Sequence, residues 1–392
     1  MCTSYSLNKI LIIIFFLFCN ACKEHDCCSG LWGTYSIISD KNIVVHGIEL
    51  DNIEIDISNT SGIGKWELIE NNLVFIDNLF GGLFYYDLNF DFQFILLGKG
   101  RGPNQIPGRI AGHAIYHDKI FILSPSYDFY EVNFDGEIIN KGFLNFETDE
   151  VPFSKIENEP KSEYKAIYEV EYAGLSIDYL NKDEVIISIS SSHPLFNPYT
   201  SKNYYKEART LALLNLKDNT IKDIFGGYSP IYLEYDHIPY MSYLHLNKID
   251  DNKFLLGFEA DSLIYFFEGT NEINYAFGYN GRGMNLKYPT VNDYSREDEF
   301  FEEYRPKYGH FAYLKYVSSE NLTFRGYQKD DFQLTDGLQI YKEGVLIGDI
   351  DVPKGFKIIG YNQPYYYAEI SNPVNENFTT GVDSITLYRF KL

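Results

Sequence analysis

Cysteine is missing from almost the whole chain. The 392 residues contain five cysteines, and all of them lie within the first 28 positions: Cys2, Cys19, Cys22, Cys27 and Cys28. The 364 residues that follow Cys28 contain none. A folded domain built from that part of the chain has no disulfides and no thiolate metal site.

Long apolar runs are also scarce, since the longest one near the N-terminus covers only the nine residues 10–18. That is about half of the ~20 residues that a membrane-spanning helix needs. Lys9 precedes the run and Ala21 follows it, which predicts a signal peptide over residues 1–21. The order Phe18-Cys19-Asn20-Ala21-Cys22 resembles a bacterial lipobox, which implies that Cys22 becomes the first mature residue and carries a lipid. A signal peptide that is cleaved without lipidation is the alternative.

The four residues after Cys22 are Lys23-Glu24-His25-Asp26. They resemble the acidic export signal of Bacteroidota lipoproteins, which implies an outer-membrane lipoprotein on the cell surface. A protein on the periplasmic face is the alternative. We therefore expect a lipidated tether over residues 22–40 and a folded domain over residues 41–392.

Positive charge and tryptophan are both in short supply. Without the signal peptide the chain carries 32 Lys and Arg against 55 Asp and Glu, a net charge of −23. Nucleic acid is therefore not a predicted partner, because phosphates require cationic contacts.

The 35 Tyr and 30 Phe stand against only 2 Trp. An AT-rich genome explains this ratio better than a set of sugar-stacking platforms, which tend to use Trp.

Motifs for catalysis are lacking as well. The sequence has no Gly-x-Ser-x-Gly elbow, no His-Glu-x-x-His, no phosphate-binding loop, no EF-hand loop and no sialidase-like Asp box. His113 and His117 are separated by about 14 Å of strand, which is too far to share a metal ion. Many carboxylates are present, yet no spacing singles out a glycosidase pair. The sequence thus predicts no catalytic residue, no metal and no cofactor.

What is present is a repeated β pattern after residue 60. Each copy has a strand, a tight polar turn, an apolar strand, a loop, an aromatic strand, a second tight turn and a last strand. In the first copy the strands are predicted over 66–70, 73–77, 83–88 and 92–98. Four further copies begin near residues 111, 175, 243 and 311. The only convincing helix pattern lies over 296–305.

The sixth copy is incomplete. It offers strands over 356–361, 365–370 and 384–390, and then the chain ends at Leu392. A spare alternating strand over 52–58 precedes the first copy and can supply the missing one. Completion of a blade by the opposite terminus closes a ring of sheets. We therefore predict an all-β, six-bladed β-propeller, with a β-sandwich pair or a β-helix as alternatives.

A Gly-rich segment carries a family resemblance. Ile95-Leu96-Leu97-Gly98-Lys99-Gly100-Arg101-Gly102-Pro103, with a weaker copy over 277–284, resembles the inter-blade segment of six-bladed propeller lipoproteins of Bacteroidota, described as TolB-like or NHL-like. The resemblance implies a propeller and a surface lipoprotein of unknown function. It implies no catalytic residues.

The predicted loops differ sharply between the two faces of the ring. The first and third turns of each blade are short, whereas the second loops and the inter-blade connections contain all the long insertions, which favours the second set as the binding face. Arg101 and Arg282 lie in Gly-Arg-Gly loops there, and we expect them near the central channel as anion ligands or as partners of acidic side chains. The stretch 288–308 mixes aromatic and charged residues, as a binding loop or as a capping helix. The predicted ligand-binding residues are Arg101, Arg282, Tyr294 and Arg305.

These features predict a non-enzymatic binding or assembly module that acts through the loop-rich face, with an unknown protein or glycan partner. A propeller glycosidase or lyase acting on an exogenous glycan is the alternative. An enzyme should show at least two carboxylates or a set of histidines near the ring axis. A binding module should show a broad loop face with aromatic side chains.

Overall fold

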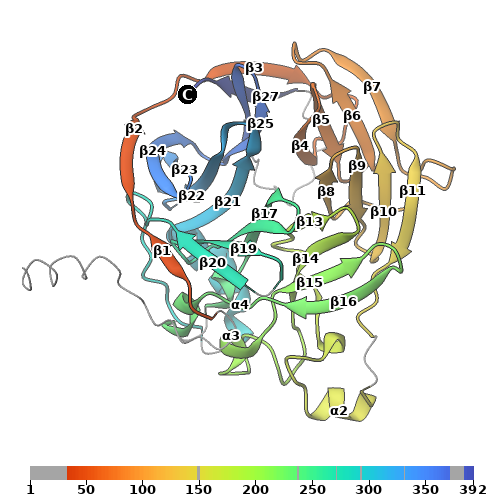
Figure 1. Cartoon of the computed structure of the whole chain (residues 1–392), viewed down its shortest axis with the longest axis vertical. Coiled ribbons are helices and arrows are strands. Elements are labelled where there is room, and N and C mark those ends of the chain that lie inside the picture. The colour runs from red at the N-terminus through yellow and green to blue at the C-terminus, as the bar shows by residue number, and fades with distance from the viewer. Residues whose placement is uncertain are drawn as a thin grey trace, which may run out of the picture.

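Six β-sheets are arranged around a central axis in a computed structural model of the chain (Figure 1). The structure describes residues 33–147, 151–235, 238–270, 272–291, 294–330, 332–370 and 384–392. Each sheet contains an antiparallel blade of four strands whose first strand lies nearest the axis, and three of the sheets have a fifth strand. The predicted six-bladed propeller is therefore confirmed, and a β-sandwich pair and a β-helix are excluded.

The blades follow the order of the sequence. Blade 1 consists of β4 (Gly64–Ile69), β5 (Asn72–Asp77), β6 (Gly82–Tyr86) and β7 (Phe92–Leu97), and blade 2 consists of β8 (Gly112–Tyr116), β9 (Lys119–Leu123), β10 (Asp128–Asn133) and β11 (Ile138–Phe143). Blade 3 consists of β13 (Ile177–Asn181), β14 (Glu184–Ser190), β15 (Leu211–Asn215) and β16 (Thr220–Phe225), and the short β12 (Glu169–Val170) pairs with β14.

Blades 4 to 6 repeat the arrangement. Blade 4 consists of β17 (Leu244–Asp250), β18 (Lys253–Phe258), β19 (Ile264–Glu268) and β20 (Glu272–Phe277), and blade 5 consists of β21 (His310–Val317), β22 (Leu322–Gln328), β23 (Thr335–Lys342) and β24 (Val345–Pro353). Blade 6 consists of β25 (Phe356–Asn362), β26 (Tyr365–Ile370), β27 (Ser384–Phe390) and β3 (Asp51–Asp56).

Burial follows from the position of a strand within its blade. The middle strands β5 and β6 are buried along almost their whole length, because neighbouring blades cover both of their faces. They accordingly read as continuous apolar runs, whereas the first strand β4 mixes buried and partly exposed side chains. The hairpin turn at Asp135-Gly136 is formed as its sequence predicts, with Gly136 at φ 81°. Buried clusters join adjacent blades, and one such cluster links blades 1 and 6.

The N-terminal segment closes the ring as predicted. β3 pairs with β27 over six residues, from Asp51 opposite Arg389 to Asp56 opposite Ser384. The same segment also runs along the outside of two further blades (Figure 1). There β1 (Ser36–Ile38) pairs in parallel with β20, and β2 (Lys41–Val45) pairs in parallel with β24. Residues 36–38, which lie within the predicted tether, thus form part of a sheet.

Helical segments are short and lie in the connections. They are α2 (Phe153–Asn158), α3 (Tyr204–Glu207), α4 (Glu297–Glu299), the 3-10 turns Lys165–Ile167, Pro230–Leu233, Pro239–Met241, Tyr294–Arg296, Arg305–Lys307 and Ser318–Glu320, and the π turn Phe300–Tyr304. The predicted helix over 296–305 is therefore found, as successive turns of different pitch. Within the described residues, no helix combines the length and the apolarity that crossing a bilayer requires.

Candidate functional site

The two faces of the ring differ as the sequence predicts. The first turns of all six blades and the third turns of blades 1 to 5 lie on one face, which we call the short-turn face. They join strands such as β4 to β5 and β6 to β7. The second loops and the inter-blade connections lie on the opposite, loop-rich face, and they contain all the helices except the single 3-10 turn Ser318–Glu320.

Aromatic side chains hold the long loops together. Tyr205 of α3 packs against Tyr228 and Tyr232 of the following inter-blade connection, with ring centroids 5.0 and 5.3 Å apart. Tyr240 stacks on Phe300, which belongs to the connection between blades 4 and 5. All five of these side chains are buried. The second loop of blade 3 and the connections after blades 3 and 4 therefore pack together on the ring through buried aromatic side chains.

Large apolar side chains are exposed on this loop-rich face. Seven of the described exposed apolar residues lie in second loops or inter-blade connections: Phe80, Phe153, Tyr172, Leu195, Leu233, Phe332 and Leu334. The exposed fractions reach 79% for Phe332 and 92% for Leu334. None of the described exposed large apolar residues lies in a first or third turn. Exposed apolar groups of this kind mark interaction surfaces when they gather on one face.

Arg101 and Arg282 do not line the central channel, in contrast to the prediction. Arg101 is exposed just after β7, the outermost strand of blade 1. Arg282 forms ion pairs with Asp349 (Nε–Oδ1, 3.4 Å) and Asp351 (Nη2–Oδ1, 3.1 Å) on β24, the fourth strand of blade 5. Each inter-blade connection runs from the outermost strand of one blade to the innermost strand of the next. The two Gly-Arg-Gly loops lie near the outermost strand.

Arg282 borders a groove of about 480 Å³ beneath the N-terminal segment. Lys41, His46, Asp349 and Asp351 also line it. The two carboxylates already accept from Arg282, and Asp351 additionally accepts from Lys329 at 2.7 Å. Arg282 therefore takes the alternative role, that of a partner for acidic side chains.

Arg305 has a buried partner. Its guanidinium pairs with both carboxylate oxygens of Glu259, with Nη1 at 3.0 Å from Oε2, and it also donates to the carbonyl of Tyr240. Its charge lies 5.1 Å from the ring centre of Tyr243. Burial raises the pKa of the Glu259 carboxyl, although Arg305 opposes that shift. This pair fastens the connection after blade 4 to the end of β18, so the guanidinium is engaged within the fold.

Tyr294 begins a 3-10 turn in the same connection, and its side chain lies outside the described part of the structure. Arg282, Tyr294 and Arg305 thus belong to the connection between blades 4 and 5, whereas Arg101 belongs to the connection between blades 1 and 2. Arg282 and Arg305 pair with carboxylates of different blades, and Arg101 is exposed beside blade 1. The structure does not gather them into one site.

The central channel contains a charged group that the sequence analysis missed. Lys315 Nζ on blade 5 lies 3.2 Å from Glu67 Oε2 on blade 1, and His113 Nε2 on blade 2 lies 3.2 Å from Glu67 Oε1. Blade 6 separates blades 5 and 1 along the ring, so the Lys315–Glu67 pair crosses the channel. Burial alone would raise the pKa of the Glu67 carboxyl, but Lys315 and His113 lower it to about 2.

Other polar groups on the first strands connect neighbouring blades. Asp178 on β13 accepts from the backbone N–H of Lys248 on β17 at 2.6 Å, and Asn247 on β17 accepts from the N–H of Tyr316 on β21 at 2.6 Å. These side chains satisfy backbone groups on the open edges of the innermost strands. Burial raises the pKa of the Asp178 carboxyl to about 6 against the opposing effect of its backbone donors.

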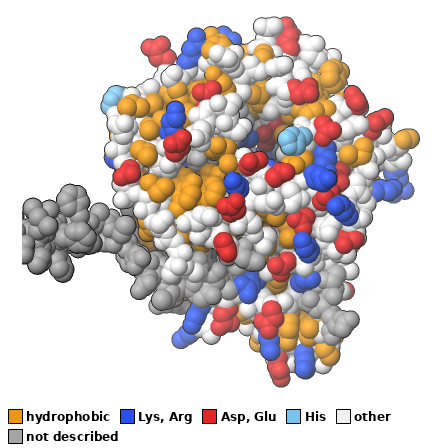
Figure 2. Space-filling model, in the orientation of Figure 1, with side chains coloured by type: hydrophobic (Ala, Val, Ile, Leu, Met, Phe, Trp, Pro, Cys, Tyr) orange, Lys and Arg blue, Asp and Glu red, His pale blue; other side chains and the backbone are white. Residues whose placement is uncertain are grey.

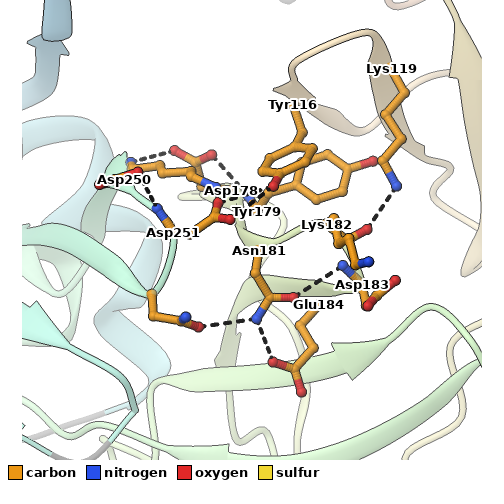
Figure 3. Close-up of polar contacts among 12 residues, drawn as sticks. Tyr116, Lys119, Asp178, Tyr179, Asn181, Lys182, Asp183, Glu184, Asp250 and Asp251 are labelled. Atoms are coloured by element: carbon orange, nitrogen blue, oxygen red, sulfur yellow. Dashed lines mark hydrogen bonds and ion pairs between the residues drawn. The ribbon is translucent and has the colours of Figure 1, made fainter.

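Polar contacts also join the blades on the short-turn face (Figure 3). Tyr116 of blade 2 donates to Asp251 of blade 4 at 3.1 Å, and Lys248 Nζ lies 2.6 Å from Asp251 and 4.0 Å from the Tyr116 ring centre. Lys119 of blade 2 donates to the carbonyl of Lys182 of blade 3 at 2.8 Å. Figure 2 shows acidic, basic and histidine side chains around a hollow near the centre of the ring.

The axial carboxylates are therefore engaged within the fold. Glu67 has Lys315 and His113 as partners, and Asp178 has two backbone donors. Within the described residues, no three His, Asp, Glu or Cys side chains are placed to hold a metal ion together. A signal for the axial group existed, because each predicted first strand contains at least one polar residue among its apolar ones. A polar residue on one strand does not indicate which side chains of other blades it meets.

Comparisons with solved structures agree with the fold. One similar structure is a member of the DUF4221 family from Bacteroides vulgatus, at 15% identity and a TM-score of 0.63, covering 88% of this chain and 98% of that one. Another is a putative exported protein from Bacteroides fragilis, at 13% identity and a TM-score of 0.51, covering 91% and 99%. A scan against protein families and a search of curated proteins found no match. At these identities the likeness establishes the propeller fold.

Proposed function

We propose that this chain is a non-enzymatic binding module that contacts a partner protein through its loop-rich face. The observation that carries the proposal is the distribution of exposed large apolar side chains, seven of which lie on that face while the short-turn face has none within the described residues. A rigid ring that carries such side chains has little backbone to order on binding. Phe and Leu dominate the set, which favours a protein partner over a glycan.

The proposal includes export and anchoring. Cys22 lies outside the described residues, and its sequence context is the support for lipid attachment of a TolB-like or NHL-like outer-membrane lipoprotein. The likeness to a putative exported protein of Bacteroides fragilis is compatible with this location. Replacing Cys22 by Ala is expected to release the protein from the membrane fraction and to abolish incorporation of labelled fatty acid. If the variant stays lipidated and membrane-bound, the attachment site is wrong.

The working face can be tested without knowing the partner. A photo-reactive phenylalanine derivative at Phe153 or Phe332 is expected to form a discrete adduct in intact cells that produce the protein, because both side chains are more than 70% exposed on the loop-rich face. The same group at Asp118 or Asp250, which are exposed on the short-turn face, serves as the matched control and should form none.

A second substitution makes the test specific. The adduct formed from position 153 should be lost when Phe332→Asp and Leu334→Asp are introduced, while the melting temperature is unchanged. Adducts that arise equally from both faces, or only from positions 118 and 250, would contradict the proposal. An adduct with a glycan would support binding through the loop-rich face but would contradict a protein partner.

A further inference from the structure

The outer edges of the blades are protected in different ways. On blades 4 and 5, β1 and β2 cover the outermost strands β20 and β24. Blades 1, 2, 3 and 6 have uncovered outermost strands within the described residues, namely β7, β11, β16 and β3. An uncovered edge is a template for pairing with another chain, and proteins normally protect it with charged side chains.

Three of these four edges contain such charges. β11 contains Lys141, β16 contains Lys222 and Asp223, and β3 contains Asp51, Glu54 and Asp56. β7 has the sequence Phe-Gln-Phe-Ile-Leu-Leu, without a charge or a proline. It is therefore the one uncovered edge in the described chain that lacks this protection.

Exposed apolar side chains lie on both faces of β7, beside the exposed Gln93. The exposed fractions are 42% for Phe92 and 46% for both Phe94 and Ile95. Phe94 stacks on Tyr85 of β6 with ring centroids 4.7 Å apart, which holds its ring in a fixed position. β7 lies on the side of the ring away from β1 and β2 (Figure 1). The exposed set is thus a preformed apolar strip along an open sheet edge.

The ends of this strip have opposite charges. Asp87 and Asp91 lie just before β7, and Lys99 and Arg101 lie just after it. The side chains of Asp91, Lys99 and Arg101 are exposed and form no ion pair within the described residues, and Asp87 accepts only backbone N–H bonds there. A second β7 that runs antiparallel would bring the acidic end of each strand to the basic end of the other.

We propose that β7 is a self-association surface, at which two copies of this chain pair their β7 strands antiparallel across a two-fold axis. The pairing would join two four-stranded blades into one eight-stranded sheet, with Phe92, Phe94 and Ile95 of both copies at its centre. Both copies would contribute the same residues to the contact, as a two-fold interface requires. This gives Arg101 a partner in the acidic end of the other copy.

Charge complementarity selects a second copy as the occupant. Any apolar extended segment could pair with the backbone of β7, but the copy itself supplies two acidic and two basic residues at matching ends. The net charge of −22 opposes association of two copies. Over a Debye length of about 8 Å at physiological salt, however, only charges close to the edge contribute strongly.

Sedimentation equilibrium of the purified protein over ~1–200 µM is the direct test, since this range covers the affinity of a small interface. We expect a monomer–dimer equilibrium for the native chain and a monomer for Ile95→Lys. The matched control is Val44→Lys, which replaces a 60% exposed apolar residue of β2 on the other side of the ring and should leave the equilibrium unchanged. Circular dichroism and melting temperature verify that each variant is folded.

Charge reversal tests the antiparallel arrangement. Asp91→Lys alone or Lys99→Glu alone should weaken the dimer about tenfold, because the two-fold axis repeats each cross-strand charge contact. An equimolar mixture of these two variants should associate at least as tightly as the native chain, since one strand then has basic ends and the other acidic ends. The double variant Asp91→Lys/Lys99→Glu should also recover the native affinity.

Each other result would overturn the proposal. A native protein that stays monomeric over the whole range excludes the second copy as the occupant of β7. Equal effects of Ile95→Lys and Val44→Lys would place the dimer contact elsewhere. A mixture of the single reversals that does not regain affinity would rule out antiparallel pairing.

Discussion

A chain that lacks residues 1–58 is expected to lose most of its stability. The deletion removes β3, so β27 loses its hydrogen-bonded partner and becomes an open edge. It also removes Ile55 and Ile57, which are each 1% exposed and pack where blade 6 meets blade 1. Burial of one such side chain contributes about 1.5–3 kcal/mol. Together with the lost strand pairing, this is comparable to the whole ~5–15 kcal/mol of a typical domain.

Thermal unfolding measures this effect, and a second deletion isolates ring closure. Removal of residues 1–47 takes away β1 and β2 but keeps β3, so we expect a much smaller fall in melting temperature. Because the longer deletion is expected to fold poorly, Ile55→Ala in the full chain provides a folded variant, with an expected loss of about 2–5 kcal/mol. A peptide of residues 33–58 added to the longer deletion should restore its melting temperature. Equal melting temperatures for both deletions and the full chain would contradict closure by β3.

The architecture was predictable because its signals are local. Apolar middle strands such as β5, tight turns such as Asp135-Gly136 and the missing last strand after Phe390 are all readable from short stretches of sequence. The pairing of β1 with β20 and of β2 with β24 was not predicted. Each joins residues more than 200 positions apart, and a strand of three to five residues carries no signal for its partner.

The position of a charged loop residue was harder to predict than the fold. The prediction placed Arg282 beside the channel because its loop leads to a first strand, but the loop begins at an outermost strand and Arg282 pairs there with Asp349. For Arg305, the sequence does not indicate that Glu259, 46 residues away, comes within contact distance. The channel group of Glu67, His113 and Lys315 arises only when the ring closes, because its members belong to three different blades.

Acid is expected to destabilise the fold through a buried histidine at the start of β21. His310 is 6% exposed. Burial, reinforced by the nearby charge of Arg305, lowers the pKa of its imidazole to about 3, and the carbonyl of Tyr308 opposes this shift only in part. His245 on the neighbouring strand β17 also faces Arg325, Lys357 and Arg305, and burial lowers its pKa to about 3 as well. Both imidazoles are therefore neutral in the folded protein at neutral pH.

The direction of the pH effect follows from proton binding. Between pH 6.5 and about 3 an unfolded histidine binds a proton that the folded one does not, so stability that is present above pH 6.5 is lost as the pH falls. Each pH unit costs about 1.4 kcal/mol per histidine. Asp178 on β13 and Glu369 on β26 act in the opposite sense, because burial raises their pKa values to about 6 and about 7. Their effect makes the protein more stable at lower pH. The free energy of unfolding of the native chain consequently varies less with pH than the histidines alone would cause. The difference in this free energy between the native chain and a histidine variant isolates the contribution of that histidine.

Urea unfolding of the native chain and of His310→Gln at several pH values between 7.5 and 4 isolates this contribution. We expect the native chain to lose its advantage over the variant by about 1.4 kcal/mol for each pH unit below 6.5, because glutamine has no proton to gain. Phe254→Leu, which reduces a buried side chain without a titrating group, should cost the same free energy at every pH. If the difference in unfolding free energy between the native chain and His310→Gln stays constant from pH 7.5 to 4, then His310 has the same pKa in the folded and unfolded chains.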